Sequence, residues 1–98
     1  MATLFITVFS VAGSTALGDP IQEEAVTIGA GSLKSNVITG TGRKRRTVRL
    51  FADADCFVTW DSDPTVLADG SNGRPMGSEN PEYWDIEAGH EIAVIERV

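Results

Sequence analysis

The chain has 98 residues and a formal net charge of −6, and its content of 42% apolar and 22% charged residues is that of one globular domain rather than of a disordered chain. Its single cysteine, Cys56, excludes an internal disulfide framework and a cysteine-based zinc site. Residues 1–49 carry six basic and three acidic residues and residues 50–98 carry two and eleven, net +3 and −9, which predicts two electrostatically different faces.

The first predicted element is a strand in "TLFITVFSV", residues 3–11. Its residues alternate between two faces with period 2, and both faces are largely apolar. We therefore expect this strand to be central in a sandwich or to be covered by another chain. The apolar run is too short for a membrane span and no Lys or Arg precedes it, so we expect a strand of the mature fold rather than a secretory leader.

Two shorter elements follow. In "IQEEAVTIGAG", residues 21–31, a strand is predicted around residues 25–28 and ended by the glycines. Asp19-Pro20 also resembles a helix start, but the glycines interrupt the segment too soon for a helix. In "SLKSNVITGTG", residues 32–42, we expect another short strand and a turn.

Two strands are predicted in "RTVRLFAD" and "DCFVTWDSD", joined tightly at residues 53–55. Each has an alternating pattern. The residues expected to share a face are Val48, Leu50 and Ala52 in the first, and Cys56, Val58 and Trp60 in the second, with Phe57 and Thr59 opposite.

Residues 62–82 form a long polar connection that holds three of the four prolines. A connection of this length inside a small domain is usually functional or packs as a compact loop. Residues 82–98 then predict a strand, an Ala-Gly-His turn and a last strand that is apolar on both faces.

The elements add up to about seven short strands with frequent turn signals. This pattern predicts an all-β fold, a single small β-sandwich or barrel of jelly-roll or immunoglobulin-like type. Residues 1–98 form the one domain, and residues 1–20 are a candidate strand or arm in an oligomer interface.

The basic run Arg43–Arg46, with Arg49 close behind, is the clearest cluster of one chemistry. Such runs occur as nucleic-acid contacts, as targeting signals and as contacts to acidic proteins. The chain is acidic overall, with a pI of about 4.5, and has no aromatic stacking platform beside the run. We therefore expect a solvated or protein-facing patch and do not expect nucleic acid as a partner.

The acidic residues lack the spacing of a known calcium loop, and Asp-x-Asp at strand ends is typical of turns. Cys56 lies in a strand pattern and the one histidine, His90, lies in a predicted turn, so they do not form a nucleophile and base pair. We expect no enzyme activity, no metal and no cofactor. Trp60, Tyr83 and Trp84 could instead form a sugar-stacking platform, as the site of a carbohydrate-binding or receptor-binding module.

The segments "VRLFADADCFVTWDSDPT" and "PEYWDIEAGHEIAVIERV" together resemble a recurring type of small all-β phage virion protein. The shared pattern is a "VRL" strand, "DCFV", a "DPT" turn, a polar loop, "PEY" and a terminal "EIAVI" strand, and it covers residues 47–98. The resemblance implies a structural part of the phage particle, such as a head decoration (cement) protein, or else a neck, tail or fibre component.

Our hypothesis from the sequence is a non-enzymatic capsid decoration protein, made in the host cytoplasm and located on the virion, that binds the major capsid protein or another virion protein. A homo-oligomer is expected, with a trimer favoured, and no membrane partner. The candidate contact residues are basic or apolar: Arg43, Lys44, Arg45, Arg46, Arg49, Leu4, Phe5 and Phe9.

Overall fold

The computed structural model describes residues 2–10, 19–40 and 44–97. The described residues contain eight strands and no helix, so the all-β prediction is confirmed and the strand count is one higher than expected. The strands are β1 (Thr3–Phe9), β2 (Pro20–Thr27), β3 (Leu33–Lys34), β4 (Arg45–Ala52), β5 (Cys56–Asp61), β6 (Arg74–Met76), β7 (Glu82–Glu87) and β8 (Glu91–Glu96).

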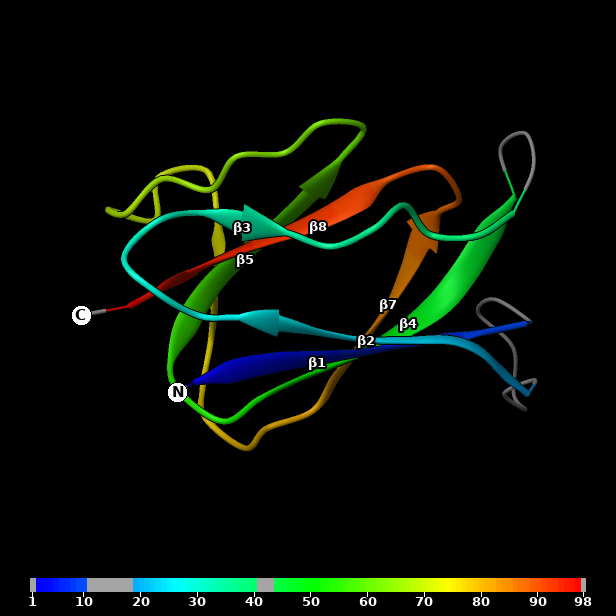
Figure 1. The fold of residues 1–98 in the computed structure, drawn as a ribbon, viewed down its shortest axis with the longest axis horizontal. Coiled ribbons are helices and arrows are strands. Elements are labelled where there is room, and N and C mark those ends of the chain that lie inside the picture. The colour runs from blue at the N-terminus through cyan, green and yellow to red at the C-terminus, as the bar shows by residue number, and fades with distance from the viewer. Residues whose placement is uncertain (1, 11–18, 41–43, 98) are drawn as a thin grey trace.

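Two four-stranded antiparallel sheets form a sandwich, which is not a closed barrel (Figure 1). Sheet A has the order β2-β1-β4-β7 and sheet B the order β3-β8-β5-β6. This is the strand order of an eight-stranded jelly roll in which β1, the first strand of the chain, occupies the position that the last strand normally has.

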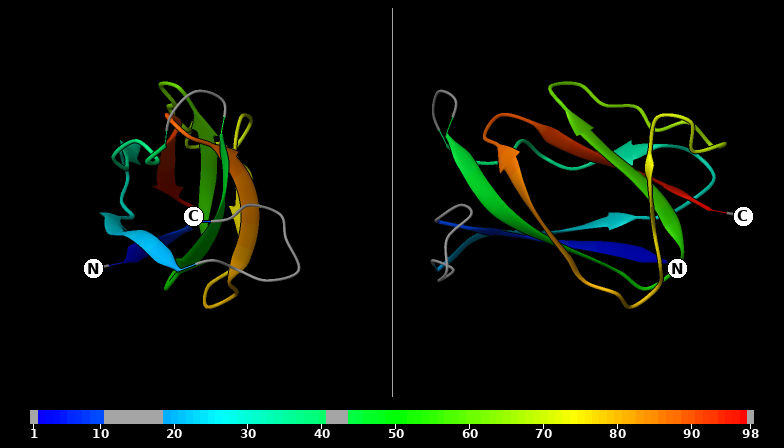
Figure 2. Two further views of the ribbon diagram at one scale, coloured as in Figure 1. Left: turned by 90° about the vertical axis from the view of Figure 1, so that its right-hand side faces the viewer. Right: turned by 180° about the vertical axis from the view of Figure 1, so that it is seen from behind.

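The two ends of the described chain support this view of the topology, because they lie at the same end of the sandwich (Figures 1 and 2). The turn after β2 joins them: Ile28 N–H donates to the carbonyl of Ala2, and Glu96 N–H donates to the carbonyl of Gly29. The chain therefore starts and finishes beside one turn.

The main core lies between the sheets and is built from one face of each strand. In β1 every second residue points inward, which buries Leu4, Ile6 and Val8. These side chains meet the inward faces of β4, β5 and β8, as the alternating patterns predict. Burial of apolar surface of this kind is the main stabilising term of a small sandwich.

A second, smaller core lies on the outer face of sheet B. Val66, from the long connection, packs on Ala93 and Ile95 of β8 and on the ring of Phe57. Strand β8 is thus buried on both faces, as its doubly apolar sequence predicts. The connection of residues 62–82 is the compact loop that covers sheet B, and it contains the short edge strand β6, which the sequence pattern did not predict.

The two tight links at residues 53–55 and 88–90 are corners between the sheets, since β4 and β7 belong to sheet A while β5 and β8 belong to sheet B. Gly89, with φ of 91°, supplies the left-handed backbone that the second corner requires. The two strands joined by each of these corners, β4 with β5 and β7 with β8, therefore belong to different sheets and do not pair edge to edge.

One open side of the sandwich, between β2 and β3, is closed by polar groups. Glu24 accepts hydrogen bonds from Asn36 N–H at both carboxylate oxygens, at 3.1 and 2.9 Å. Gln22 donates to the carbonyl of Val37 and accepts from Thr39 N–H. Glu24 and Gln22 pair with Ile6 and Val8 of β1 and therefore occupy core-facing positions of β2. Their polar side chains form hydrogen bonds with backbone groups of residues 36–39.

Candidate functional site

The outer face of sheet A carries aromatic side chains where an antiparallel sheet usually presents polar ones. Two rows cross the sheet in register. The first is Ala25, Phe5 and Phe51, and the second is Glu23, Thr7, Arg49 and Tyr83. Phe5 remains 44% exposed and Tyr83 53% exposed. We refer to Phe5, Arg49, Phe51 and Tyr83 together as the aromatic face.

Three members of the aromatic face, Phe5, Arg49 and Phe51, contact one another. The rings of Phe5 and Phe51 lie 6.4 Å apart and are tilted by 44°. The Arg49 guanidinium lies 5.3 Å from the centre of the Phe51 ring, within range of a cation–π contact. Phe5, Arg49 and Glu23 line a shallow depression of about 440 Å³ on this surface. The aromatic face together with the adjacent Glu23 thus combines apolar area, one cation and one carboxylate.

The two sheets differ in how their outer faces are covered. Sheet B is covered by the chain's own loop through Val66, whereas the described residues place no loop over Phe5 or Tyr83. In small soluble proteins, an exposed cluster of large apolar side chains often marks an interaction surface. The aromatic face is therefore the best candidate contact surface of the described chain.

The structure separates the expected contact residues. Phe5 and Arg49 belong to the aromatic face, and Phe9 is half-buried at the end of β1. Leu4 is fully buried in the main core, so its assignment as a surface contact is wrong: neighbouring residues of a strand point to opposite faces, and Leu4 points inward. Strand β1 lies between β2 and β4 in sheet A, with one apolar face in the main core, while its other face carries the partly exposed Phe5.

The basic run serves two purposes, as far as it is described; Arg43 lies outside the described residues. Lys44 and Arg45 are exposed, and Arg45 donates to the carbonyl of Asp85 at 3.3 Å. Arg46 is half-buried and donates to two backbone carbonyls, those of Ser10 and Thr39. The run is thus partly structural, and it presents two of its cations to solvent.

Tyr83 does not share a surface with Trp84, because the two are neighbours on β7 and point to opposite sides of sheet A. The three-residue platform expected from the sequence is therefore wrong. Trp60 and Trp84 do come together, with ring centres 5.4 Å apart and planes tilted by 48°. They line a depression of about 320 Å³ with Arg74, Asn72 and Thr59, and we call this depression the indole cleft.

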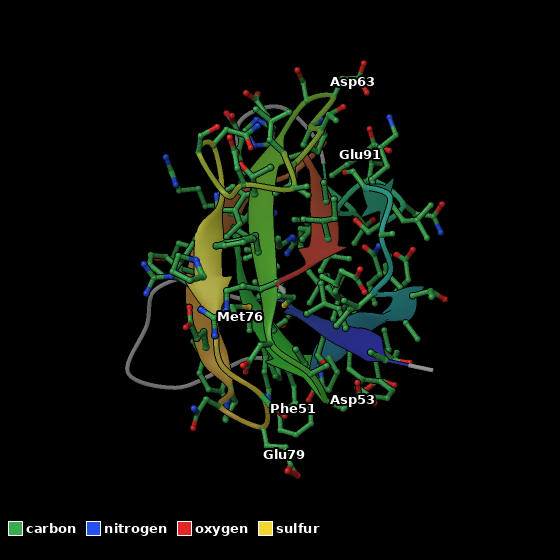
Figure 3. All side chains as sticks on the ribbon, turned by 90° about the vertical axis from the view of Figure 1, so that its left-hand side faces the viewer. Phe51, Asp53, Asp63, Met76, Glu79 and Glu91 are labelled. Carbon is green, nitrogen blue, oxygen red and sulfur yellow. The ribbon has the colours of Figure 1, made fainter. Side chains whose placement is uncertain are left out.

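The carboxylates do not converge on one point. Figure 3 shows Asp63 and Glu91 at the top of the view and Asp53 and Glu79 at the bottom. No group of three or more His, Cys, Asp or Glu side chains that could hold a metal ion occurs among the described residues. Lys34 ties the upper pair together, at 2.5 Å from Asp63 and 3.3 Å from Glu91. Its hydrogen bonds to these carboxylates raise the pKa of Lys34 and lower that of Asp63.

Cys56 and His90 lie in separate environments. Cys56 is fully buried in the main core, and this burial raises the pKa of its thiol to about 11. His90 sits at the corner between β7 and β8, with Nε2 at 3.2 Å from Glu87. A thiol held protonated in the core is a packing residue, since the thiolate is the reactive form.

No described segment forms a helix with the length and apolar character needed to cross a membrane. Comparison with known proteins finds no matching family, no matching curated protein and no matching solved structure.

Proposed function

We propose that this chain is a non-enzymatic structural protein of a phage particle, a head decoration protein that binds the major capsid protein through its aromatic face. The observation that carries the proposal is the contrast between the sheets: sheet B is covered by the protein's own loop, and sheet A exposes Phe5 and Tyr83. The resemblance of residues 47–98 to small virion proteins supports the same function. So does the jelly-roll strand order, which is common in viral shell proteins, although fold alone does not assign function.

The chemistry of the aromatic face suits a protein partner. Aromatic residues and Arg are enriched at the centres of protein interfaces, where they supply large contact areas. Arg49 is stacked on Phe51 and thereby held in place, which lowers the side-chain entropy lost on binding. Lys44 and Arg45 add two exposed cations at one end of the same sheet, suited to a partner with an acidic rim.

The chain acts as a homo-oligomer, with a trimer favoured. A symmetric oligomer repeats a modest binding surface and so raises the avidity for a capsid lattice without stronger single contacts. Light scattering after size exclusion measures the solution mass directly, and a trimer is the expected result. A monomer at all accessible concentrations would contradict this part of the proposal.

The binding test uses phage heads purified from a mutant that lacks the gene for this chain. Purified protein is added back and its occupancy on the heads is measured by sedimentation and electron cryomicroscopy. We expect saturable binding to heads. Binding confined to necks, tails or fibres would instead favour the second candidate, a component of those parts, and binding to no part of the particle would refute the virion proposal.

The aromatic face is tested in the same assay with the double variant Phe5→Ser/Tyr83→Ser. We expect at least about a tenfold loss of affinity, the size of one interface hot spot. The matched control is Leu67→Ser, because Leu67 is also about half exposed, at 49%, but lies in the loop that covers sheet B. Equal affinity of the double variant and the control would place the contact elsewhere.

A further inference from the structure

The indole cleft opens on the side of the sandwich between the edge strands β6 and β7, apart from the aromatic face. Trp84 and Glu82 occupy core-facing positions of β7, and Arg74 and Trp60 the corresponding positions at the edge of sheet B. At the other open side of the sandwich such positions are used to satisfy a neighbouring backbone segment. Here Trp60, Arg74 and Trp84 line an open depression of about 320 Å³, and Glu82 is bonded to two of them, Arg74 and Trp84.

The polar groups of the cleft are fixed before any ligand arrives. Arg74 Nε donates to Glu82 Oε1 at 2.9 Å, and its guanidinium stacks on the Trp84 ring at 4.4 Å. The indole N–H of Trp84 donates to the same Oε1 atom at 3.0 Å. One carboxylate oxygen thus orients both a cation and an aromatic ring, and a rigid arrangement of this kind lowers the ordering cost of binding.

Hydrogen-bonding capacity remains open at the rim. Among the described residues, the structure pairs neither the two Nη groups of Arg74 nor the Oε2 atom of Glu82. Thr59 also lines the depression. Donors and acceptors therefore stand beside the half-buried ring of Trp60.

We propose that the indole cleft binds a saccharide, with one pyranose ring stacked on the indole of Trp60 and its hydroxyls bonded to Arg74 and Glu82. A sugar ring has an apolar C–H face and a rim of hydroxyls that both donate and accept, which matches an aromatic face with paired donors and acceptors at its edge. The volume lies at the lower end of the roughly 300–1,000 Å³ typical of small-ligand sites and suits one or two sugar units.

A second protein is a poorer fit to this cleft than a sugar. The depression is small, and its lining residue Arg74 is paired with Glu82, so it offers neither a broad apolar area nor a net charge for steering. Because the cleft opens at the side of the sandwich, it stays accessible when the aromatic face is occupied. The saccharide site therefore does not depend on the proposed capsid contact.

The test starts from a glycan array of neutral hexose, N-acetylhexosamine and uronic acid oligomers, probed with the full chain. The strongest glycan is then titrated into the labelled protein and followed by the two tryptophan indole N–H signals in nuclear magnetic resonance spectra. We expect binding to at least one glycan class, with shifts of both indole signals, and at least a tenfold loss of affinity in both Trp60→Ala and Arg74→Ala.

Trp60→Tyr serves as the conservative variant and should keep most of the affinity, because it retains an aromatic face. Leu33→Ser is the matched control, since Leu33 is exposed at the opposite edge of sheet B and should bind as the unaltered protein does. Unfolding curves establish that each variant is folded. The proposal is overturned if no glycan binds at millimolar concentration, or if Trp60→Ala and Arg74→Ala bind as well as the control.

Discussion

The Arg46 guanidinium donates a 2.6 Å hydrogen bond from Nη1 to the main-chain carbonyl of Ser10, 36 positions earlier in the chain. Its Nε donates to the carbonyl of Thr39 at 3.2 Å. Next to Thr39, Gly40 has φ of 144°, and a β-carbon there would lie 2.7 Å from the β-carbon of Ala88, so the position favours glycine. One side chain of the basic run therefore joins the end of β1 to the segment that precedes β4.

Substitution Arg46→Ala should lower the free energy of unfolding by about 1–3 kcal/mol, since two carbonyls lose a charged donor. Arg45→Ala is the matched control: Arg45 is exposed and makes one long bond, so its loss should stay within about 0.5 kcal/mol. Urea unfolding followed by tryptophan fluorescence measures both. If the two substitutions lower the free energy of unfolding equally, the hydrogen bonds of Arg46 do not stabilise the fold more than that of Arg45 does.

Acidification should destabilise the protein below about pH 4. Asp55 accepts a 2.8 Å hydrogen bond from Ser78 N–H and lies 3.5 Å from the Arg97 guanidinium. These partners hold the pKa of Asp55 below its ordinary value of 3.8, the Ser78 bond contributing most. The stabilisation is thus fully present above pH 3.8 and is lost as the pH falls through the lower, folded-state pKa.

The corresponding measurement is the urea midpoint between pH 2 and pH 7 for the unaltered protein and for Asp55→Asn. The variant has no charge to lose at this position, so its midpoint should fall less on acidification. The lowered pKa values of Asp63 and Asp69 act in the same direction and remain in both proteins. If the urea midpoints of the two proteins fall in parallel on acidification, Asp55 does not contribute to the loss of stability.

The Cys56 thiol should resist labelling in the folded protein. It is fully buried, and burial raises its pKa to about 11. At pH 8 a labelling reagent therefore cannot reach the sulfur, and the thiol is not in its reactive thiolate form. Labelling with a chromogenic disulfide reagent should require unfolding, and its rate should rise steeply with urea. Complete labelling within seconds under native conditions would show that the core opens at this point.

Substitution Gly70→Ala should destabilise the loop that covers sheet B. The backbone of Gly70 has φ of 75°, and a β-carbon there would lie 2.5 Å from the ring of Phe57. Backbone strain and the displaced ring together should cost about 1–3 kcal/mol. Gly31→Ala is the control, because Gly31 has open space around it. Thermal unfolding of both variants gives the comparison, and an unchanged Gly70→Ala would contradict the packing described here.

The fold was largely predictable from local patterns. Alternation of apolar and polar residues correctly predicts the inward faces of β4 and β5, because the two-residue period of a strand is a local property. The short strand β6 escaped prediction because Arg74 and Pro75 lack that alternation, and the strand exists only through its pairing with β5. The sequence predicts both Leu4 and Phe5 as contacts, because it does not show which face of β1 is covered.

The candidate sites depend more strongly on tertiary structure. Neither Arg74 nor Glu82 was singled out from the sequence, although both complete the indole cleft, because residues eight positions apart on different sheets show no local signal. Tyr83 and Trp84 were grouped as neighbours, yet the pleat of β7 places them on opposite faces. The strand that the sequence predicts from residue 82 already implies this separation, because neighbouring residues of a strand point to opposite faces.

The sequence by itself determined the all-β class, the alternating core positions and the lone buried cysteine. These follow from composition and from a strand period that each segment carries alone. The tertiary structure decided which strands pair, that a loop packs on the outer face of sheet B while the described residues place no loop over Phe5 or Tyr83 of sheet A, and that Trp60 meets Trp84 beside Arg74. These relationships depend on long-range pairing, and contacts between distant segments produce no local sequence pattern from which they could be predicted.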